Sequence, residues 1–162
     1  MTKIPIDLKH KPVVVSEDYD LVDGRYANKS DAKGLSLGLA QWNDRGKVEI
    51  SAKIWRHTGE KWSRQSEEMP LHRALDLAIL ICQSKLYFAN LYRKSEKDYP
   101  DYPRFARIPL QGAAMNASIC TDNEHIEEDI KLFDDCLHQD DEILGERLQR
   151  LAALLKELEY MK

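Results

Sequence analysis

Apolar and polar side chains alternate along residues 35–42 and again along residues 48–57. A period of two is typical of a strand that buries one face, and the Asp-Arg-Gly-Lys segment at 44–47 has residues that tight turns favour. The two segments are therefore predicted to form an antiparallel hairpin. The face predicted to be buried carries Leu35, Leu37, Leu39, Val48, Ile50, Ala52 and Ile54. The other face carries Ser36, Gly38, Ala40, Trp42, Glu49, Ser51, Lys53, Trp55 and His57.

The turn also sets the predicted register of the hairpin. A four-residue loop places Leu39 opposite Ala52 on the buried face. A further turn predicts a short third strand over residues 61–66, and the β-branched run Val13–Val15 predicts an edge strand. All three tryptophans of the chain would then lie in one sheet.

A long apolar helix is predicted over residues 70–92. Pro70 suits the first helical turn, because its φ is fixed and the first backbone donors of a helix have no intrahelical partner. Apolar residues at helical spacing form a stripe that can cover a sheet face. They are Leu71, Leu75, Ala78, Cys82, Leu86 and Ala89.

The predicted fold class is α+β, with an antiparallel sheet of three to four strands packed against the long helix and two further C-terminal helices. We expect a single domain over 1–162, with an arm and loop at 1–34, the sheet-helix core at 35–92, a connector at 93–121 and an acidic helical hairpin at 122–162. The last helix has a leucine seam that packs in its own chain or against another copy. The seam consists of Leu144, Leu148, Leu151, Leu155 and Leu158.

The charge of the chain is unevenly distributed. The net charge is −4 at pH 7. Residues 1–117 carry 19 basic and 15 acidic side chains, whereas residues 118–162 carry 5 basic and 13 acidic side chains. This pattern allows a basic working surface on the body of the protein, although strong nucleic-acid-binding domains are usually more basic.

Cysteine usage and hydropathy predict a cytoplasmic location. The three cysteines are odd in number and widely spaced, which favours reduced thiols over a disulfide framework. The sequence has no apolar run long enough to span a bilayer and no hydrophobic segment of a signal peptide at its start. We therefore expect no membrane partner.

The densest cluster of binding-type side chains lies on the indole-bearing face of the predicted hairpin and in the segment that follows it. Cationic side chains contact phosphates and exposed indoles stack on bases in proteins that hold single-stranded nucleic acid. The predicted ligand-binding residues are Trp42, Lys53, Trp55, Arg56, His57, Lys61, Trp62 and Arg64. The alternative is a second packed layer, because Ser36, Gly38 and Ala40 are small enough to lie under the C-terminal helices.

Residues 35–71 resemble the sheet-then-helix core of the positive-cofactor-four type of single-stranded-DNA-binding proteins. The resemblance rests on a strand that ends in Gln41-Trp42-Asn43, a second strand that ends in Trp55, and a helix opened by Ser66-Glu67-Glu68-Met69-Pro70-Leu71. It implies a dimer that grips unpaired DNA, with Lys53, Trp55, Lys61 and Trp62 in the gripping positions. The acidic helices after residue 118 are not part of that pattern.

The whole chain also resembles an uncharacterised bacterial domain family, and this resemblance implies no activity. It rests on Asp23-Gly24-Arg25-Tyr26, residues 34–43 and residues 55–71.

The sequence offers few candidates for catalysis. The candidate acid–base groups are His57 with Glu60, and His72 with Arg73 and Asp76. The candidate metal-binding pairs on the acidic helix are His125 with Glu128 or Asp129, and His138 with Asp134 or Asp135. Such pairs are also common on solvated surfaces, and no phosphate loop, dinucleotide fingerprint or HExxH motif occurs. We therefore expect no cofactor and no bound metal.

The sequence thus favours a non-enzymatic cytoplasmic binding module, with single-stranded nucleic acid as the first ligand to test. The second hypothesis is a protein–protein interaction or oligomerisation module that assembles, as a homodimer, through its C-terminal helices. The third is an enzyme that uses the pair of His57 and Glu60.

Overall fold

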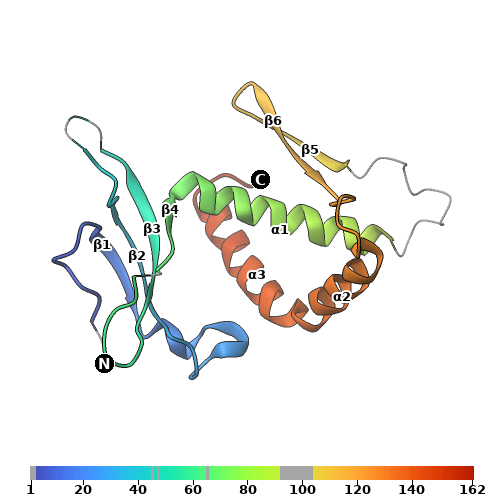
Figure 1. Cartoon of the computed structure of the whole chain (residues 1–162). Coiled ribbons are helices and arrows are strands. Elements are labelled where there is room, and N and C mark those ends of the chain that lie inside the picture. Colours follow the sequence, from blue (N-terminus) through green and yellow to red (C-terminus); the bar gives the residue numbers. More distant parts are fainter. Residues whose placement is uncertain (1–2, 45, 47, 65, 92–103) are drawn as a thin grey trace. The chain divides into compact units, whose positions relative to one another are not determined.

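Figure 1 shows a computed structural model of the chain, which has the α+β architecture that the sequence predicts. The chain divides into two compact units, Met1–Ile79 and Leu80–Lys162. The long helix α1 (Leu71–Leu91) confirms the predicted helix, and it begins in the first unit and continues into the second. The described residues are 3–44, 46, 48–64, 66–91 and 104–162.

The first unit contains a four-stranded antiparallel sheet with the strand order β1-β2-β3-β4 (Figure 1). Its first strand lies at one edge, which confirms the edge strand predicted at Val13–Val15. Two short 3-10 turns, η1 (Tyr19–Leu21) and η2 (Gly24–Tyr26), follow that strand. The strands are β1 (Lys11–Glu17), β2 (Ala32–Leu39), β3 (Ile50–Arg56) and β4 (Glu68–Pro70).

The third strand predicted over residues 61–66 is wrong. Among the described residues of that stretch, Trp62 makes an isolated bridge with His57, and β4 takes the place beside β3. Residues 58–61 form a tight turn in which the Thr58 hydroxyl donates to the carbonyl of Lys61. The segment therefore continues as a loop, and it carries Trp62 next to the sheet without adding a strand.

The register of the hairpin differs from the prediction by two residues. Leu39 pairs with Ile50, whereas the four-residue loop predicted Ala52 as its partner. The cause is Asn43, whose side-chain amide both donates to the carbonyl of Glu49 and accepts from its backbone N–H. These side-chain bonds close the loop between β2 and β3, which is longer than the predicted four residues. A shift by two residues keeps every side chain on its predicted face.

The two faces of the sheet have the opposite burial from the one predicted. Leu37 and Leu39 are 42% and 40% exposed, whereas Ser51 and Trp55 on the small-residue face are 0% and 1% exposed. Residues 3–10 cover the small-residue face, with Ile4 buried at 6% exposure. The prediction that the leucines are buried is therefore wrong for Leu37 and Leu39. The alternative of a packed layer over the small-residue face holds at Ser51 and Trp55, and the covering segment is residues 3–10.

Two glycines of β2 make room for this covering segment and for the strand that follows it. A Cβ atom at Gly34 would lie 2.7 Å from the side chain of Ile4, and a Cβ atom at Gly38 would lie 2.0 Å from the carbonyl oxygen of Lys11. Any larger residue would collide at these positions. The glycines therefore explain why the chain can return so closely over the small-residue face.

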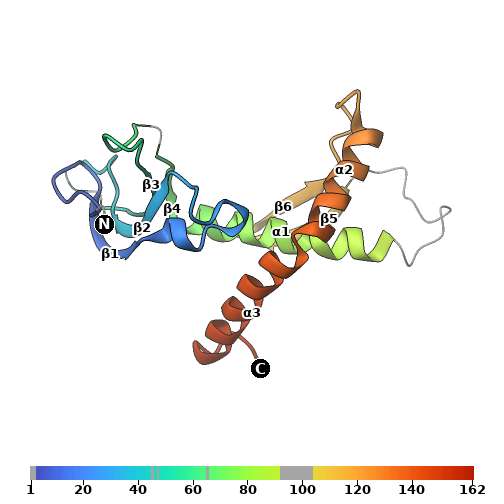
Figure 2. The same cartoon turned by 90° about the horizontal axis from the view of Figure 1, so that it is seen from below.

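The second unit contains a two-stranded hairpin, β5 (Arg104–Leu110) and β6 (Ala113–Ser118), visible in Figures 1 and 2. Its loop is Gln111-Gly112, with both φ angles positive, which is typical of the two-residue turn that matches strand twist. The sequence predicts only a connector over 93–121, so this hairpin is an element that the sequence did not predict. The proline-rich part of the connector before Arg104 lies outside the described residues.

The two predicted C-terminal helices are confirmed as α2 (Ile126–Gln139) and α3 (Asp141–Glu157). The chain changes direction between them at Asp140 (Figure 1). The aromatic core of this unit includes Phe88, which is 5% exposed and packs 5.3 Å from the ring of Phe133. In the described part of the chain, no helix combines the length and apolar character that crossing a bilayer requires.

Candidate functional site

A pocket of about 720 Å³ opens between residues 3–10 and the small-residue face of the sheet. Two indoles line it, Trp55 from β3 and Trp62 from the loop that follows. Four cationic side chains and one carboxylate are also part of its described lining, and we call this hollow the indole pocket. These charged residues are Lys3, Lys9, Lys53, Arg64 and Asp7.

A chain of edge-to-face ring contacts runs past this pocket. Trp55 lies 5.8 Å from the ring of His10 on one side and 5.8 Å from the ring of Trp62 on the other. The ring of Trp62 then lies 5.0 Å from that of His57. The ammonium of Lys53 sits 3.9 Å from the centroid of Trp55, in cation–π geometry. Four of the predicted residues therefore come together, Lys53, Trp55, His57 and Trp62, but Trp55 is already packed by its neighbours.

Beneath the pocket, a continuous hydrogen-bond chain runs from an indole to a carboxylate. Trp55 Nε1 donates to Ser36 Oγ at 2.8 Å, and Ser36 Oγ lies 2.9 Å from His10 Nε2. On the other side of the ring, His10 Nδ1 lies 3.0 Å from Ser51 Oγ, which donates to Glu68 Oε2 at 2.9 Å. Ser51 gives its one hydroxyl proton to Glu68, so its Oγ accepts the Nδ1–H of His10. In the neutral ring with this tautomer, Nε2 accepts from the hydroxyl of Ser36.

The titration of this cluster is governed by its burial. His10 is fully buried, and desolvation lowers the pKa of its imidazole, although the nearby carboxylate of Glu68 opposes the shift. Desolvation also lowers the pKa of Lys53, whose ammonium lies 3.8 Å from Glu68 Oε1, and the carboxylate again opposes the shift. The side chain of Glu68 is 1% exposed. The carboxyl group of Glu68 and the amino group of Lys53 are therefore largely buried beside the imidazole of His10.

Sequence reasoning missed His10 and Glu68 because their partners are distant in the chain. His10 contacts Ser36, which is 26 positions away in the chain, and Ser51, which is 41 positions away. No local sequence pattern indicates such pairs. The usable signal was the pair of serines, Ser36 and Ser51, on a face that also carries buried glycines and alanine. Hydroxyls on a covered sheet face need polar partners.

The other predicted ligand-binding residues lie outside the described lining of the indole pocket. Trp42 is 40% exposed and its indole N–H donates to Glu49. Lys61 is exposed in the turn after β3. Arg56 forms ion pairs with Asp31 at 2.6 Å and with Glu67 at 2.8 Å, and the hydrogen bonds to these carboxylates raise the pKa of its guanidinium. Its charge is therefore already neutralised by two partners.

The candidate catalytic and metal-binding pairs can also be located. His57 Nδ1 accepts a hydrogen bond from the backbone N–H of Gly59 at 3.0 Å, so this nitrogen is engaged by its own turn. His138 Nδ1 lies 3.4 Å from Asp134 Oδ1 on α2. Within the described ranges, no three metal-ligating side chains gather in an arrangement that could hold an ion.

A comparison with protein families gives one match, to a family of unknown function (DUF6530), and the match covers residues 2–160. The chain belongs to the DUF6530 family. This confirms the predicted membership of the whole chain in a family without a known activity. No curated protein and no solved structure matches the chain. The resemblance to the single-stranded-DNA-binding core stays a prediction.

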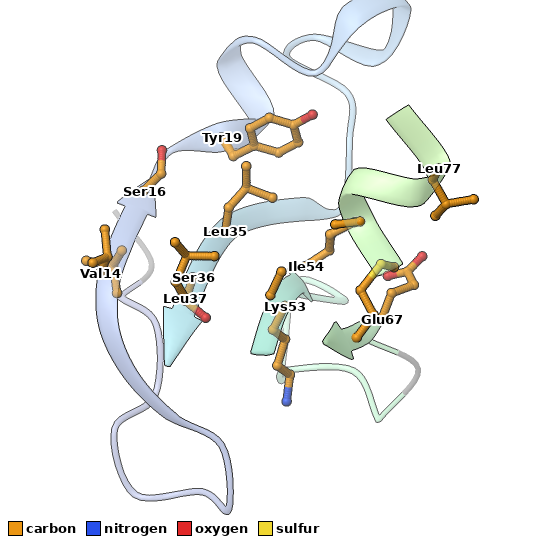
Figure 3. A pocket seen from close by; sticks show the side chains of 14 residues that line it. Val14, Ser16, Tyr19, Leu35, Ser36, Leu37, Lys53, Ile54, Glu67 and Leu77 are labelled. Atoms are coloured by element: carbon orange, nitrogen blue, oxygen red, sulfur yellow. The ribbon is translucent and has the colours of Figure 1, made fainter. Parts of the chain in front are cut away.

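This DUF6530 chain has a second hollow, on the leucine face of the same sheet. It has a volume of about 520 Å³, and its walls come from β1, β2, β3, β4 and the first turns of α1. Figure 3 shows Leu35, Leu37 and Ile54 between Val14 on one side and Leu77 on the other, with Tyr19 at one end. We call it the apolar groove. It exists because residues 3–10 cover the opposite face of the sheet and leave the leucines accessible.

Proposed function

We propose that this protein is a non-enzymatic binding module that takes a segment of single-stranded nucleic acid in the indole pocket. The observation that carries the proposal is the convergence of four cationic side chains and two indoles on one hollow, with one carboxylate in its described lining. Proteins hold unpaired strands by the same combination of phosphate contacts and base–aromatic contacts. A volume of about 720 Å³ lies within the range of small-ligand pockets.

The burial of the rings changes which indole is expected to contact a base. Trp55 is 1% exposed and donates its N–H to Ser36, so it offers little surface to a ligand. Trp62 is half-buried and lines the same pocket. Base contact is therefore expected at Trp62. Trp55 packs against the ring of Trp62 through their edge-to-face contact and helps to fix its orientation.

Phosphates are expected at the exposed cations of the pocket. Lys9 and Arg64 are exposed and line the pocket, the first on the covering segment and the second on the loop after β3. Lys53 is less suited to this task, because it already lies against Glu68 and the ring of Trp55. Two exposed cations that line one pocket can each contact a phosphate of the same short strand.

The test is a titration of a labelled short oligothymidine with the full chain, followed by fluorescence anisotropy at several salt concentrations. Binding should weaken with salt, because each phosphate contact releases counterions. Lys9→Ala and Arg64→Ala should each weaken binding and reduce the slope of log K against log salt by about 0.7. Lys29→Ala, an exposed lysine outside the pocket lining, is the matched control and should leave the slope unchanged.

Two results would refute the proposal. One is the absence of binding at low salt by a chain that is shown to be folded. The other is binding that Lys9→Ala, Arg64→Ala and Trp62→Ala all leave unchanged, because the ligand would then lie outside the indole pocket.

A further inference from the structure

The strand β1 ends the sheet with three exposed valines. It pairs with β2 on one side, and within the described ranges its backbone makes no hydrogen bond on the other side. Val13, Val14 and Val15 are 74%, 58% and 48% exposed. Unpaired edges with β-branched side chains readily accept another strand, and proteins usually protect them with charges, prolines or bulges. Here the proline and the bulge lie near the start, before the regular segment Val14–Glu17.

This edge is continuous with the apolar groove. Val14, Val15 and Ser16 form the β1 wall of the groove, so the groove reaches the free edge of the sheet. Leu37 and Ile50 on the same sheet face are 42% and 54% exposed. A strand added at β1 would therefore both use the free backbone groups and extend one wall of the groove.

We infer that the added strand is β1 of a second copy of this chain, paired antiparallel across a two-fold axis. Such a contact is self-complementary, because each copy brings the same edge and both edges are used at once. The bulge adds Val13 to the strand, so an end-to-end pairing has its axis between Val14 and Val15. Val14 of one copy then lies beside Val15 of the other, and Lys11 of one copy lies near Glu17 of the other. Lys11 and Glu17 lie at the two ends of the strand. The antiparallel pairing therefore places Lys11 of each copy beside Glu17 of the other, which gives two contacts between opposite charges.

The parallel alternative has no such match. Side-by-side parallel strands in register would place Lys11 beside Lys11 and Glu17 beside Glu17, which is unfavourable for like charges in neighbouring strands. The charges therefore favour the antiparallel pairing. A single strand pair buries less than the roughly 1,200–2,000 Å² of a standard stable interface, so the dimer should dissociate on dilution.

The first experiment measures the mass of the full chain by sedimentation equilibrium over a range of concentrations. A dimer mass that falls to the monomer mass on dilution is expected, and a monomer mass at every attainable concentration would overturn the proposal. Val14→Lys places an ammonium group beside Val15 of the other copy at two positions that flank the axis, and should weaken association about tenfold or more. Val48→Lys, at a valine that is 71% exposed and outside β1, is the matched control and should leave association unchanged.

The second experiment tests the register by exchanging charges. Lys11→Glu and Glu17→Lys should each weaken association, because each creates two like-charged contacts across the axis. The double variant Lys11→Glu/Glu17→Lys restores opposite charges and should recover the association of the unmodified chain. Single variants without effect, or a double variant that does not recover, would overturn this pairing.

A third variant separates this interface from assembly through the last helix. Leu158 belongs to the leucine seam, caps the end of α3 and is 65% exposed, so Leu158→Lys should fold and should leave the β1 dimer intact. If Leu158→Lys abolishes the dimer while Val14→Lys does not, the β1 proposal is overturned in favour of the helix. The thermal unfolding midpoint of each variant checks that it is folded. The oligonucleotide titration is independent of this result, because neither Val14 nor Leu158 lines the indole pocket.

Discussion

At the scale of single residues, the neutral imidazole of His10 explains why the cluster under the indole pocket tolerates burial. Its Nδ1 proton is donated to Ser51, and its Nε2 lone pair accepts from Ser36. A second proton on the ring would point Nε2–H at Ser36 Oγ, which already receives the N–H of Trp55. The hydroxyl proton of Ser36 would then lose its acceptor. Hydrogen bonding and desolvation therefore both disfavour the charged ring.

This arrangement predicts a loss of stability as the pH falls. The unfolded chain binds a proton at His10 with the usual pKa of about 6.5, whereas burial lowers the pKa of the folded chain. Below 6.5 the unfolded state therefore holds more protons, and the free energy of unfolding decreases as the pH falls toward the lower folded pKa. Glu68 moderates this effect, and the positive charge of Lys53 strengthens it.

The measurement is the urea midpoint, followed by tryptophan fluorescence, at pH values above and below about 6.5. His10→Gln should remove this part of the pH dependence, and should cost about 1–3 kcal/mol because it disturbs the buried chain of hydrogen bonds. His72→Gln, at an exposed position on α1, is the control and should keep the pH dependence of the unmodified chain. The explanation fails if His10→Gln keeps the same pH dependence.

At the scale of elements, alternation predicted the strands and their faces, but it did not predict which face is covered. Leu35, Leu37 and Leu39 share a face as expected, because parity survives a register shift of two residues. Burial was assigned from hydrophobicity alone, and the covering segment contributes only a few apolar side chains, such as Ile4. Gly34 makes room for Ile4 of the covering segment, and Gly38 makes room for the backbone at the start of β1. Space at a glycine is a steric property without a periodic signal.

The same reasoning accounts for the missed elements. The hairpin of β5 and β6 turns at Gln111-Gly112, and the sequence contrast around it is weak because its second strand is rich in alanine. The candidate site was predicted in part: Lys53, Trp55, Trp62 and Arg64 share the indole pocket. Its remaining walls come from residues 3–10, which the sequence analysis treated as an extended arm. Local patterns identify elements, whereas a site formed by a returning segment depends on tertiary contacts.

Gly38 provides a test of the close approach of β1 to β2. Gly38→Ala would place a Cβ atom 2.0 Å from the backbone carbonyl of Lys11, which cannot move as a flexible side chain could. We expect a loss of about 3 kcal/mol or more in the free energy of unfolding, measured by tryptophan fluorescence in urea. Gly145→Ala on α3 is the control, since it has open space, and should stabilise its helix by about 0.5–1 kcal/mol as measured by circular dichroism. A fully stable Gly38→Ala would contradict the close approach of β1 to β2.

At the scale of the whole molecule, the two compact units have separate buried residues. Trp55 and Ala40 belong to the first unit, and Phe88 and Ala117 belong to the second. All three tryptophans lie in the first unit, whereas α2 and α3 lie in the second. Tryptophan fluorescence and far-ultraviolet circular dichroism therefore report mainly on different units, and a two-state transition requires that the two probes coincide.

A substitution at Phe88 separates a cooperative molecule from two independently unfolding units. Phe88 is 5% exposed and packs against Phe133, so Phe88→Ala should cost the second unit about 3–5 kcal/mol. We expect the circular dichroism midpoint in urea to fall while the tryptophan fluorescence midpoint stays in place. Trp55→Phe, which removes the hydrogen bond to Ser36, should have the converse effect, measured by the two remaining indoles. If both probes shift together in both variants, the chain unfolds as the single domain that the sequence predicts, because damage to either core would then lower one shared free energy of unfolding.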